Sequence, residues 1–408
     1  MAALRERGGL DYWRIALMHK DIFKLLKREN DNLDKAGLYK REMTIKGPQG
    51  PYVMTKSGRK LINFTGLDFL GLSVNTELLR VAQEAMSIYG IGVASPRLLS
   101  GTHSVHTELE DAIGQFFSTE QTMVLPTGYQ ANQCVFEPLF NEQDTIFCDS
   151  HAHPSLIDGM RISEAQRFFY RNCDMNDLED KLKRSAQTRY RIIVTDGVYP
   201  LDGSLAPMDA IVSLAARYDA LVLLNDTLGV GILGESGRGT AEHFRCLDKI
   251  DLITGSFGTV LGGFPGGYVT GNVDLVNWLR QRARPYHFST AISPAHAAAA
   301  RAAFGAVDSG GASRRLLLSK LKGLMEGLGT AGLTILGGQH PLFSVLTEDA
   351  LTTQTRLDSL LQQHKIYAAG FCYPVVPKEM ARIRFSLNLS HSDEDISKLV
   401  SSWESFRS

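Results

Sequence analysis

Short apolar runs that alternate with helix-forming stretches constrain the fold of this chain more than any other feature. Four of them have the length and composition of buried strands: 123–125, 145–148, 192–195 and 221–224. Between them lie helical patterns, of which one opens at Pro207 and places its apolar residues on a single face. Buried strands alternating with helices predict an α/β fold, in which helices cover both faces of a mostly parallel central sheet.

The length of 408 residues allows one large domain with smaller terminal pieces. We expect an N-terminal arm over residues 1–60, a large α/β domain over 61–295 and a small C-terminal α+β domain over 296–408. Residues 52–64 are predicted to form a hairpin, and Ser392 is predicted to cap a last helix. In the arm, apolar residues at helical spacing predict a packing helix: Trp13, Ile15, Met18, Ile22, Leu25 and Leu26.

Composition narrows the class of partner. A formal net charge of -1 gives no field for gathering nucleic acid or anionic lipid, so we expect a small molecule or another protein as partner. No stretch approaches the roughly 18 apolar residues of a membrane span, and the N-terminus lacks the apolar core of a signal peptide. This predicts a cytoplasmic protein. The five cysteines are odd in number and lack metal-ligand spacing, which predicts reduced thiols and no metal site.

A glycine-rich segment, DLITGSFGTVLGGFPGGYVTGN over residues 251–272, is the strongest candidate for a ligand site. Two predicted strands, 252–255 and 268–270, bracket a loop with five glycines. Glycine lets the backbone approach a ligand closely and adopt turns that other residues avoid. We therefore expect the chemistry of the chain to lie near this loop.

Several blocks of the sequence resemble, in order and spacing, those of the α-oxoamine synthase family, from about Leu61 to the end. The blocks include YGIGVASPRLLSGTHSVHTELED, LPTGYQAN, DSHAHPSLIDG, TDGVYPLDGSLAPM, GVGILGESGRGTAEHF and HFSTAISP. Members join an amino acid to an acyl thioester with loss of carbon dioxide, using pyridoxal phosphate. The resemblance implies the fold type I, aminotransferase-like architecture and a dimer with its site at the subunit interface. It does not by itself imply the activity.

Part of the family's cofactor site is retained. The resemblance places the amides that cradle the cofactor phosphate at Thr127, Gly128 and Tyr129. The side chains that reach this phosphate from the partner subunit correspond to Ser289 and Thr290. His153 stands where the family has a histidine that stacks on the pyridine ring, and His151 lies in the same loop.

The reactive groups of the family are replaced. The lysine that forms the imine with the cofactor corresponds to Thr259, whose hydroxyl cannot form that bond. The aspartate that keeps the pyridine nitrogen protonated corresponds to Asn225, a neutral amide. Asp226 is not expected to compensate, because neighbouring side chains of a strand point to opposite faces.

Four further replacements accompany these two. The family's histidine three residues beyond Asn225 is Leu228, and the serine or threonine near the phenolic oxygen is Pro200. The asparagine of an early block, INFTGLDFLGL over residues 62–72, is Leu67, and the arginine that binds the substrate carboxylate is Cys372. The resemblance therefore predicts that pyridoxal phosphate is not bound covalently and is lost.

Two functions of different class follow. The first is a pyridoxal-phosphate-independent acyltransferase acting on an acyl thioester, either acyl-CoA or acyl-carrier protein. In it, His153 or His151 would be the base, the amides near Gly128 would stabilise the oxyanion, and Cys372 or Thr259 would contact the substrate. We favour this function because a retained ring-stacking histidine indicates a ligand pocket, and we expect a homodimer.

The second function is that of a non-catalytic subunit paired with a lysine-bearing paralogue. It is suggested by a partial similarity to the lysine-lacking first subunit of serine palmitoyltransferase, in the segment GIGVASPR and in the Leu228 block. His153 and the segment HFST are more typical of active members. Association with a catalytic partner would distinguish this heterodimer from the enzyme.

Overall fold

A seven-stranded sheet forms the centre of the larger lobe in the computed structural model, which describes residues 21–35, 39, 41–185 and 187–403. In spatial order the strands are β4 (Gln121–Leu125), β10 (Gly267–Gly271), β9 (Leu252–Ser256), β8 (Leu221–Asn225), β7 (Arg191–Asp196), β5 (Thr145–Asp149) and β6 (Gln166–Tyr170). The five strands from β9 to β6 are parallel, whereas β10 is antiparallel to both of its neighbours. The predicted mostly parallel sheet is confirmed.

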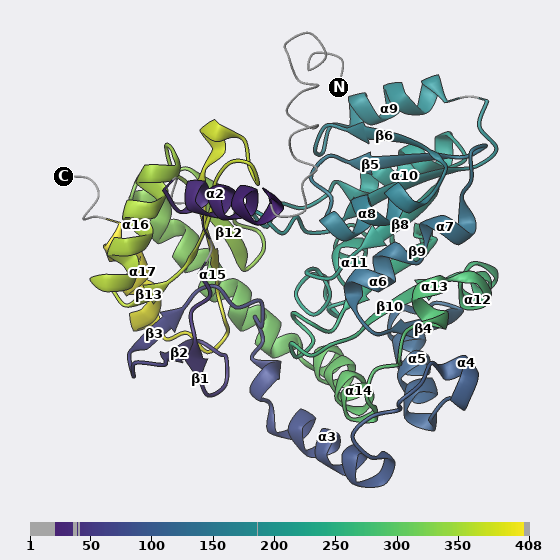
Figure 1. The fold of residues 1–408 in the computed structure, drawn as a ribbon, viewed down its shortest axis with the longest axis horizontal. Helices are drawn as coiled ribbons and strands as arrows, with labels where there is room; N and C mark the ends of the chain where they lie inside the picture. The colour runs from purple at the N-terminus through teal and green to yellow at the C-terminus, as the bar shows by residue number, and fades with distance from the viewer. Residues whose placement is uncertain (1–20, 36–38, 40, 186, 404–408) are drawn as a thin grey trace.

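Helices cover both faces of this sheet (Figure 1) because its strands are apolar on both sides. On β4, Met123 and Leu125 pack into one core cluster and Val124 into another. The first face is covered by α6 (Gly128–Gln133), α7 (Phe136–Leu139), α8 (Pro154–Ile162) and α12 (Val273–Arg282). The second is covered by α5 (Ser104–Phe117), α9 (Met175–Arg184), α10 (Met208–Arg217) and α14 (Pro294–Ser309).

The smaller lobe is built on a four-stranded antiparallel sheet of the C-terminal part. Its order is β11 (Ile335–Gly337), β12 (Leu342–Leu346), β15 (Arg382–Ser386) and β14 (Ala369–Phe371). The accompanying helices are α15 (Gly311–Thr330), α16 (Ala350–Gln362) and α17 (Asp393–Ser402). Ser392 caps α17 and forms a reciprocal capping box with Asp395, as the sequence predicts.

The N-terminal segment joins the smaller lobe. The predicted hairpin is present as β2 (Tyr52–Thr55) and β3 (Lys60–Asn63), flanked by β1 (Ile45–Lys46). β3 also pairs in parallel with β13 (Ile366–Tyr367), so the predicted boundary at residue 61 falls inside a strand shared with the C-terminal part. The boundary at residue 296 falls inside α14, which packs on α3 (Thr76–Tyr89) and α5 of the larger lobe.

Helix α2 (Asp21–Lys35) contains part of the predicted N-terminal helix. None of its residues is buried, so it does not pack as expected against the rest of the single chain. Trp13, Ile15 and Met18 lie outside the described residues. Among the helices that the structure describes, none has the length and apolarity needed to cross a bilayer.

Short elements complete the connections, and three of them, α4, α11 and α13, lie in the larger lobe (Figure 1). They are η1 (Leu72–Val74), α4 (Arg97–Ser100), α11 (Thr240–His243), η2 (Leu247–Lys249), α13 (Arg284–His287) and η3 (Lys378–Met380).

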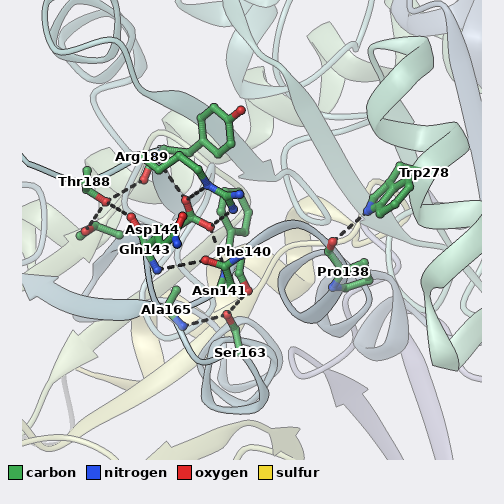
Figure 2. A network of polar contacts seen from close by, with 12 residues as sticks. Pro138, Phe140, Asn141, Gln143, Asp144, Ser163, Ala165, Thr188, Arg189 and Trp278 are labelled. Atoms are coloured by element: carbon green, nitrogen blue, oxygen red, sulfur yellow. Dashed lines mark hydrogen bonds and ion pairs between the residues drawn. The ribbon is translucent and has the colours of Figure 1, made fainter.

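A buried carboxylate organises the amino ends of β5 and β7 (Figure 2). Asp144 accepts hydrogen bonds from Arg189 Nε at 2.9 Å and Nη2 at 2.6 Å, and from the backbone N–H groups of Asn141 and Tyr190. Nearby, Ser163 donates to the carbonyl of Phe140 at 2.9 Å. These contacts anchor the end of the sheet opposite to the candidate site described next.

Candidate active site

A cavity of about 160 Å³ opens beyond the carboxyl ends of the parallel strands. This edge is where open α/β sheets bind ligands, because loops from several strands converge there. The strands β7, β8 and β9 supply their last residues, and most of the other residues lie in the segments that follow β4, β5, β7, β8 and β9. Leu67 comes from the segment after β3. The lining consists of Leu67, Gly128, Tyr129, Asn132, His153, Ser155, Asp196, Val198, Pro200, Asn225, Thr227, Leu228, Ser256 and Thr259.

Half of the candidate residues from the sequence meet in this cavity. His153, Asn225, Thr259, Gly128 and Tyr129 all line it. So do the three positions at which the resemblance implies lost polar groups, namely Leu67, Pro200 and Leu228. Together with Val198 they give the cavity an apolar wall.

Other candidates lie outside the cavity. The ring of His151 is exposed and stands edge-on to Tyr199, with 6.4 Å between the ring centroids. Cys372 lies in the segment between β14 and β15 and is not part of the lining. His151 and Cys372 therefore lie outside this cavity of the single chain, and their roles stay predictions.

The predicted phosphate-binding residues surround the start of α6. Thr127 is the N-cap and accepts a hydrogen bond from the backbone N–H of Gln130 at 3.1 Å. Ser289 accepts a hydrogen bond from Gln130 Nε2 at 3.0 Å, and Thr290 is exposed. Neither Ser289 nor Thr290 lines the cavity of the single chain.

Close packing requires glycine at the start of α6. A Cβ atom added to Gly128 would lie 2.4 Å from the Cβ of Ser256, at the end of β9. Real Cβ atoms do not approach so closely, so any larger residue would push α6 away from the sheet. Gly128 therefore lets the backbone of α6 form one wall of the cavity.

A directed chain of buried hydrogen bonds holds His153. Thr254 Oγ1 donates to Asn132 Oδ1 at 2.5 Å, and Asn132 Nδ2 donates to Ser155 Oγ at 2.8 Å. His153 is the N-cap of α8, where its Nδ1 lies 2.6 Å from Ser155 Oγ and accepts the backbone N–H of Ser155 at 3.2 Å. Burial lowers the pKa of His153, which favours the neutral imidazole.

Asp196 lines the cavity but was not among the candidates from the sequence. It ends β7 directly beside Asn225, and its carboxylate accepts Asn225 Nδ2 at 2.5 Å and the backbone N–H of His153 at 2.6 Å. Burial raises the pKa of Asp196 to about 7, although these hydrogen bonds favour the ionised form. The signal in the sequence was an acidic residue directly after the predicted buried strand 192–195.

Asp226 faces away from the cavity, as expected from the alternation along β8. Its carboxylate accepts the backbone N–H and the hydroxyl of Thr240, both at 2.6 Å. Burial raises the pKa of Asp226 to about 6. Asp226 therefore stabilises the segment that follows β8 and does not line the cavity.

Thr259 Oγ1 donates a long hydrogen bond of 3.3 Å to the carbonyl of Thr227. No lysine is present among the described residues that line the cavity. The same part of the chain shows no group of three or more histidine, cysteine, aspartate or glutamate side chains arranged for a metal ion.

A second residue that the sequence reasoning missed is Arg384 on β15. Its Nη1 donates to the carbonyl of the cavity residue Pro200 at 2.9 Å, and its guanidinium lies 4.9 Å from the ring centroid of Phe371. Arg384 Nε has no hydrogen-bond partner in the described chain. Burial lowers the pKa of Arg384 to about 10, so the side chain is still a cation at neutral pH.

Comparisons with known proteins agree with this architecture. A profile of the family described as aminotransferase class I and II matches residues 59–402. The 2-amino-3-ketobutyrate coenzyme A ligase of Salmonella typhimurium is 37% identical over 385 residues, covering 94% of this chain and 96% of the relative. The 8-amino-7-oxononanoate synthase of Thermosipho melanesiensis is 35% identical over 382 residues, covering 94% and 97%. The solved structure of Sphingomonas wittichii serine palmitoyltransferase superimposes with a TM-score of 0.87 at 27% identity, covering 95% and 97%.

Proposed function

Because the chain belongs to the aminotransferase class I and II family, and its relatives place it among the α-oxoamine synthases, we propose that it transfers an acyl group from an acyl thioester without forming an imine with pyridoxal phosphate. The observation that carries this proposal is Thr259, which faces the cavity where the resemblance implies the imine-forming lysine. A hydroxyl cannot replace a primary amine in that bond.

The residues present do not fit pyridoxal phosphate as the family uses it. The described lining offers no amine, and Asn225 already uses both ends of its amide, with Nδ2 on Asp196 and Oδ1 accepting Thr227 Oγ1 at 2.7 Å. A neutral amide cannot keep a pyridine nitrogen protonated. We therefore derive no step of the reaction through this cofactor.

Loss of the imine changes which atom of an amino acid reacts. In the family the amine of the amino acid is bound to the cofactor, whereas here it would be free to act as the nucleophile. Without an electron sink the carboxylate has no route to leave as carbon dioxide. The expected product is an amide, formed between the acyl group and the amine of the acceptor, with release of the thiol.

Arg384 supports an acceptor that bears a carboxylate. Its buried Nε lacks a partner in the described chain, and the cation lies beside Pro200 at the edge of the cavity. An arginine in such a place gains charge-assisted hydrogen bonds when a carboxylate binds. An amino acid provides both the carboxylate for Arg384 and the amine for acyl transfer.

The decisive experiment uses the purified chain alone with an acyl-CoA and a mixture of amino acids. Thiol release and the appearance of an N-acyl amino acid by mass spectrometry are expected, with the carboxyl carbon retained. An acyl-carrier protein in place of acyl-CoA tests the second possible donor. Release of labelled carbon dioxide by the chain alone would contradict the proposal.

The same experiment tests the alternative of a non-catalytic subunit. If the chain alone releases no thiol, and a co-purifying lysine-bearing paralogue supplies all turnover, the acyltransferase proposal is wrong. The heterodimer would then be the functional unit.

A further inference from the structure

We infer that Asp196 is the proton acceptor of this pocket, and that His153 is held as a hydrogen-bond donor that cannot serve as its base. The inference rests on the proposed acyl transfer, and it assigns the two roles differently from the sequence, which favoured His153 or His151 as base. It stands on the directions of the hydrogen bonds that surround both side chains.

The direction of one bond determines the tautomer of His153. The backbone N–H of Ser155 can only donate, so Nδ1 of His153, which receives it at 3.2 Å, must carry a lone pair. Ser155 Oγ receives Asn132 Nδ2 and is therefore free to donate its own proton to the same Nδ1 at 2.6 Å. In a neutral imidazole the proton then resides on Nε2.

This arrangement leaves His153 with a donor and no available lone pair. Its Nε2–H can stabilise the oxygen of a thioester carbonyl as negative charge develops. It cannot remove a proton from an acceptor unless the ring gives up its Nδ1 contacts. Burial also disfavours the protonated ring that a base must become.

Asp196 has the properties that His153 lacks. Its carboxylate lines the cavity, and its two described hydrogen bonds come from neutral donors, Asn225 Nδ2 and the backbone N–H of His153. The neighbouring carboxylates of Asp149 and Asp226 further disfavour its negative charge, and the buried thiol of Cys148 also lies close by. The pKa of about 7 matches the value that a general base needs at neutral pH.

The step balances without any further reactant. The neutral amine nitrogen of the acceptor attacks the thioester carbonyl carbon, and Asp196 takes one proton from that nitrogen. The C–N bond forms and the C–S bond breaks, with its electron pair going to sulfur. Asp196 then gives the proton to the departing thiolate, which restores the carboxylate.

The activity test compares three variants by their pH profiles. Asp196→Asn is expected to lower kcat by about a hundredfold or more, the scale for loss of a general base. Asn225→Asp places a second carboxylate beside Asp196. It is expected to move the acidic limb of the profile of kcat against pH to higher pH by about one unit. His153→Gln is expected to lower kcat and to leave the position of this acidic limb unchanged.

A matched control separates this role from the mere burial of a carboxylate. Asp251 is also partly buried and accepts the backbone N–H of Val222 at 2.8 Å, but it lies at the amino end of β9, away from the cavity. Asp251→Asn is expected to keep the acidic limb of the wild type. Near-normal kcat in folded Asp196→Asn, or loss of the acidic limb only in His153→Gln, overturns the inference.

Nuclear magnetic resonance tests the tautomer of His153 and the pKa of Asp196 directly, even if the chain shows no acyl transfer. Nitrogen shifts are expected to show the Nε2–H tautomer of His153, and the carboxyl carbon of Asp196 is expected to titrate near pH 7. An Nδ1–H tautomer, or a carboxyl that titrates near its ordinary value of about 4, overturns the assignment. Absence of thiol release with both signals as expected overturns the proposed function alone.

Discussion

The amide of Asn225 donates a 2.5 Å hydrogen bond to the carboxylate of Asp196, across the last residues of the neighbouring parallel strands β8 and β7. Both side chains are buried, and the hydrogen bond from the neutral amide of Asn225 favours the ionised form of Asp196. A change at residue 225 therefore changes the protonation of residue 196. Residue 225 is therefore expected to set the pKa of Asp196, in addition to being the position at which the resemblance implies a lost aspartate.

Replacing Thr259 by lysine is expected to supply the missing amine. After addition of pyridoxal phosphate, Thr259→Lys should gain an absorbance band that borohydride removes, with the label mapped to residue 259 by mass spectrometry. Thr259→Met has a side chain of similar length without an amine and should gain no band. A borohydride-stable label on a pocket residue of the wild type would contradict the absence of an imine.

Gly128→Ala is expected to destabilise the fold because its Cβ would lie 2.4 Å from that of Ser256. Overpacking of this kind costs about 1 to 3 kcal/mol of the free energy of unfolding. Gly305 in α14 is the matched control, because an added Cβ there meets nothing within 4 Å. Gly305→Ala should leave stability unchanged or raise it by about 0.5 to 1 kcal/mol. Chemical unfolding of both variants measures the difference in the free energy of unfolding. Equal stabilities would contradict the prediction, because they would show that α6 shifts away from Ser256 without cost.

Glu110→Gln is expected to cost about 3 to 5 kcal/mol of stability, the usual range when one partner of a buried ion pair is removed. Glu110 is buried and accepts Arg97 Nη1 at 2.6 Å and the backbone N–H of Val124 at 2.8 Å, and Arg280 lies 3.2 Å away. Glu84→Gln, which breaks an exposed pair with Arg80, should change stability far less than Glu110→Gln does, because water screens the exposed pair. Thermal melting of the two variants at neutral pH compares them, and a small effect at Glu110 would exclude a structural role for this cluster.

Acid is expected to weaken the network at Asp144. Burial favours the neutral carboxyl, but the hydrogen bonds from Arg189 and the backbone N–H of Asn141 outweigh it and lower the pKa of Asp144 in the folded state. Stability from this group is therefore present above the unfolded pKa and is lost as the pH falls through the lowered folded pKa. Asp144→Asn should flatten that part of the curve of unfolding free energy against pH. A variant curve parallel to that of the wild type would contradict this.

Phe288 tests the predicted homodimer. Its side chain is 78% exposed in the single chain, and it directly precedes Ser289 and Thr290, which the resemblance assigns to the neighbouring site. Phe288→Glu is expected to yield a monomer in solution, because an interface core does not accept an unpaired charge. Leu351, 77% exposed on α16 of the other lobe, is the control, and Leu351→Glu should remain a dimer. A wild type that is monomeric at high concentration would exclude the homodimer.

Local patterns in the sequence predicted a large part of the fold. The period of two along β8 and the capping sequence at Ser392 are properties of neighbouring residues, and both were read correctly. The parallel pairing of β3 with β13 joins residues that are far apart in the chain, and no local pattern encodes it. The roles proposed for Asp196 and Arg384 were not predicted for the same reason, because each depends on which distant side chains the residue contacts.

The shared sheet of β3 and β13 also has a consequence for synthesis of the chain. Tyr52 donates a 2.6 Å hydrogen bond to Asp395, a partner 343 residues further along. At roughly 5 to 20 residues per second, a ribosome needs on the order of 20 to 70 seconds to make that intervening stretch. Until residues 366–367 of β13 are made, which takes most of this time, the β2–β3 hairpin has an unpaired edge that can bind another nascent chain. The β2–β3 hairpin therefore completes its contacts only after the C-terminal part has been synthesised. Chaperone protection of the hairpin is most needed before that point.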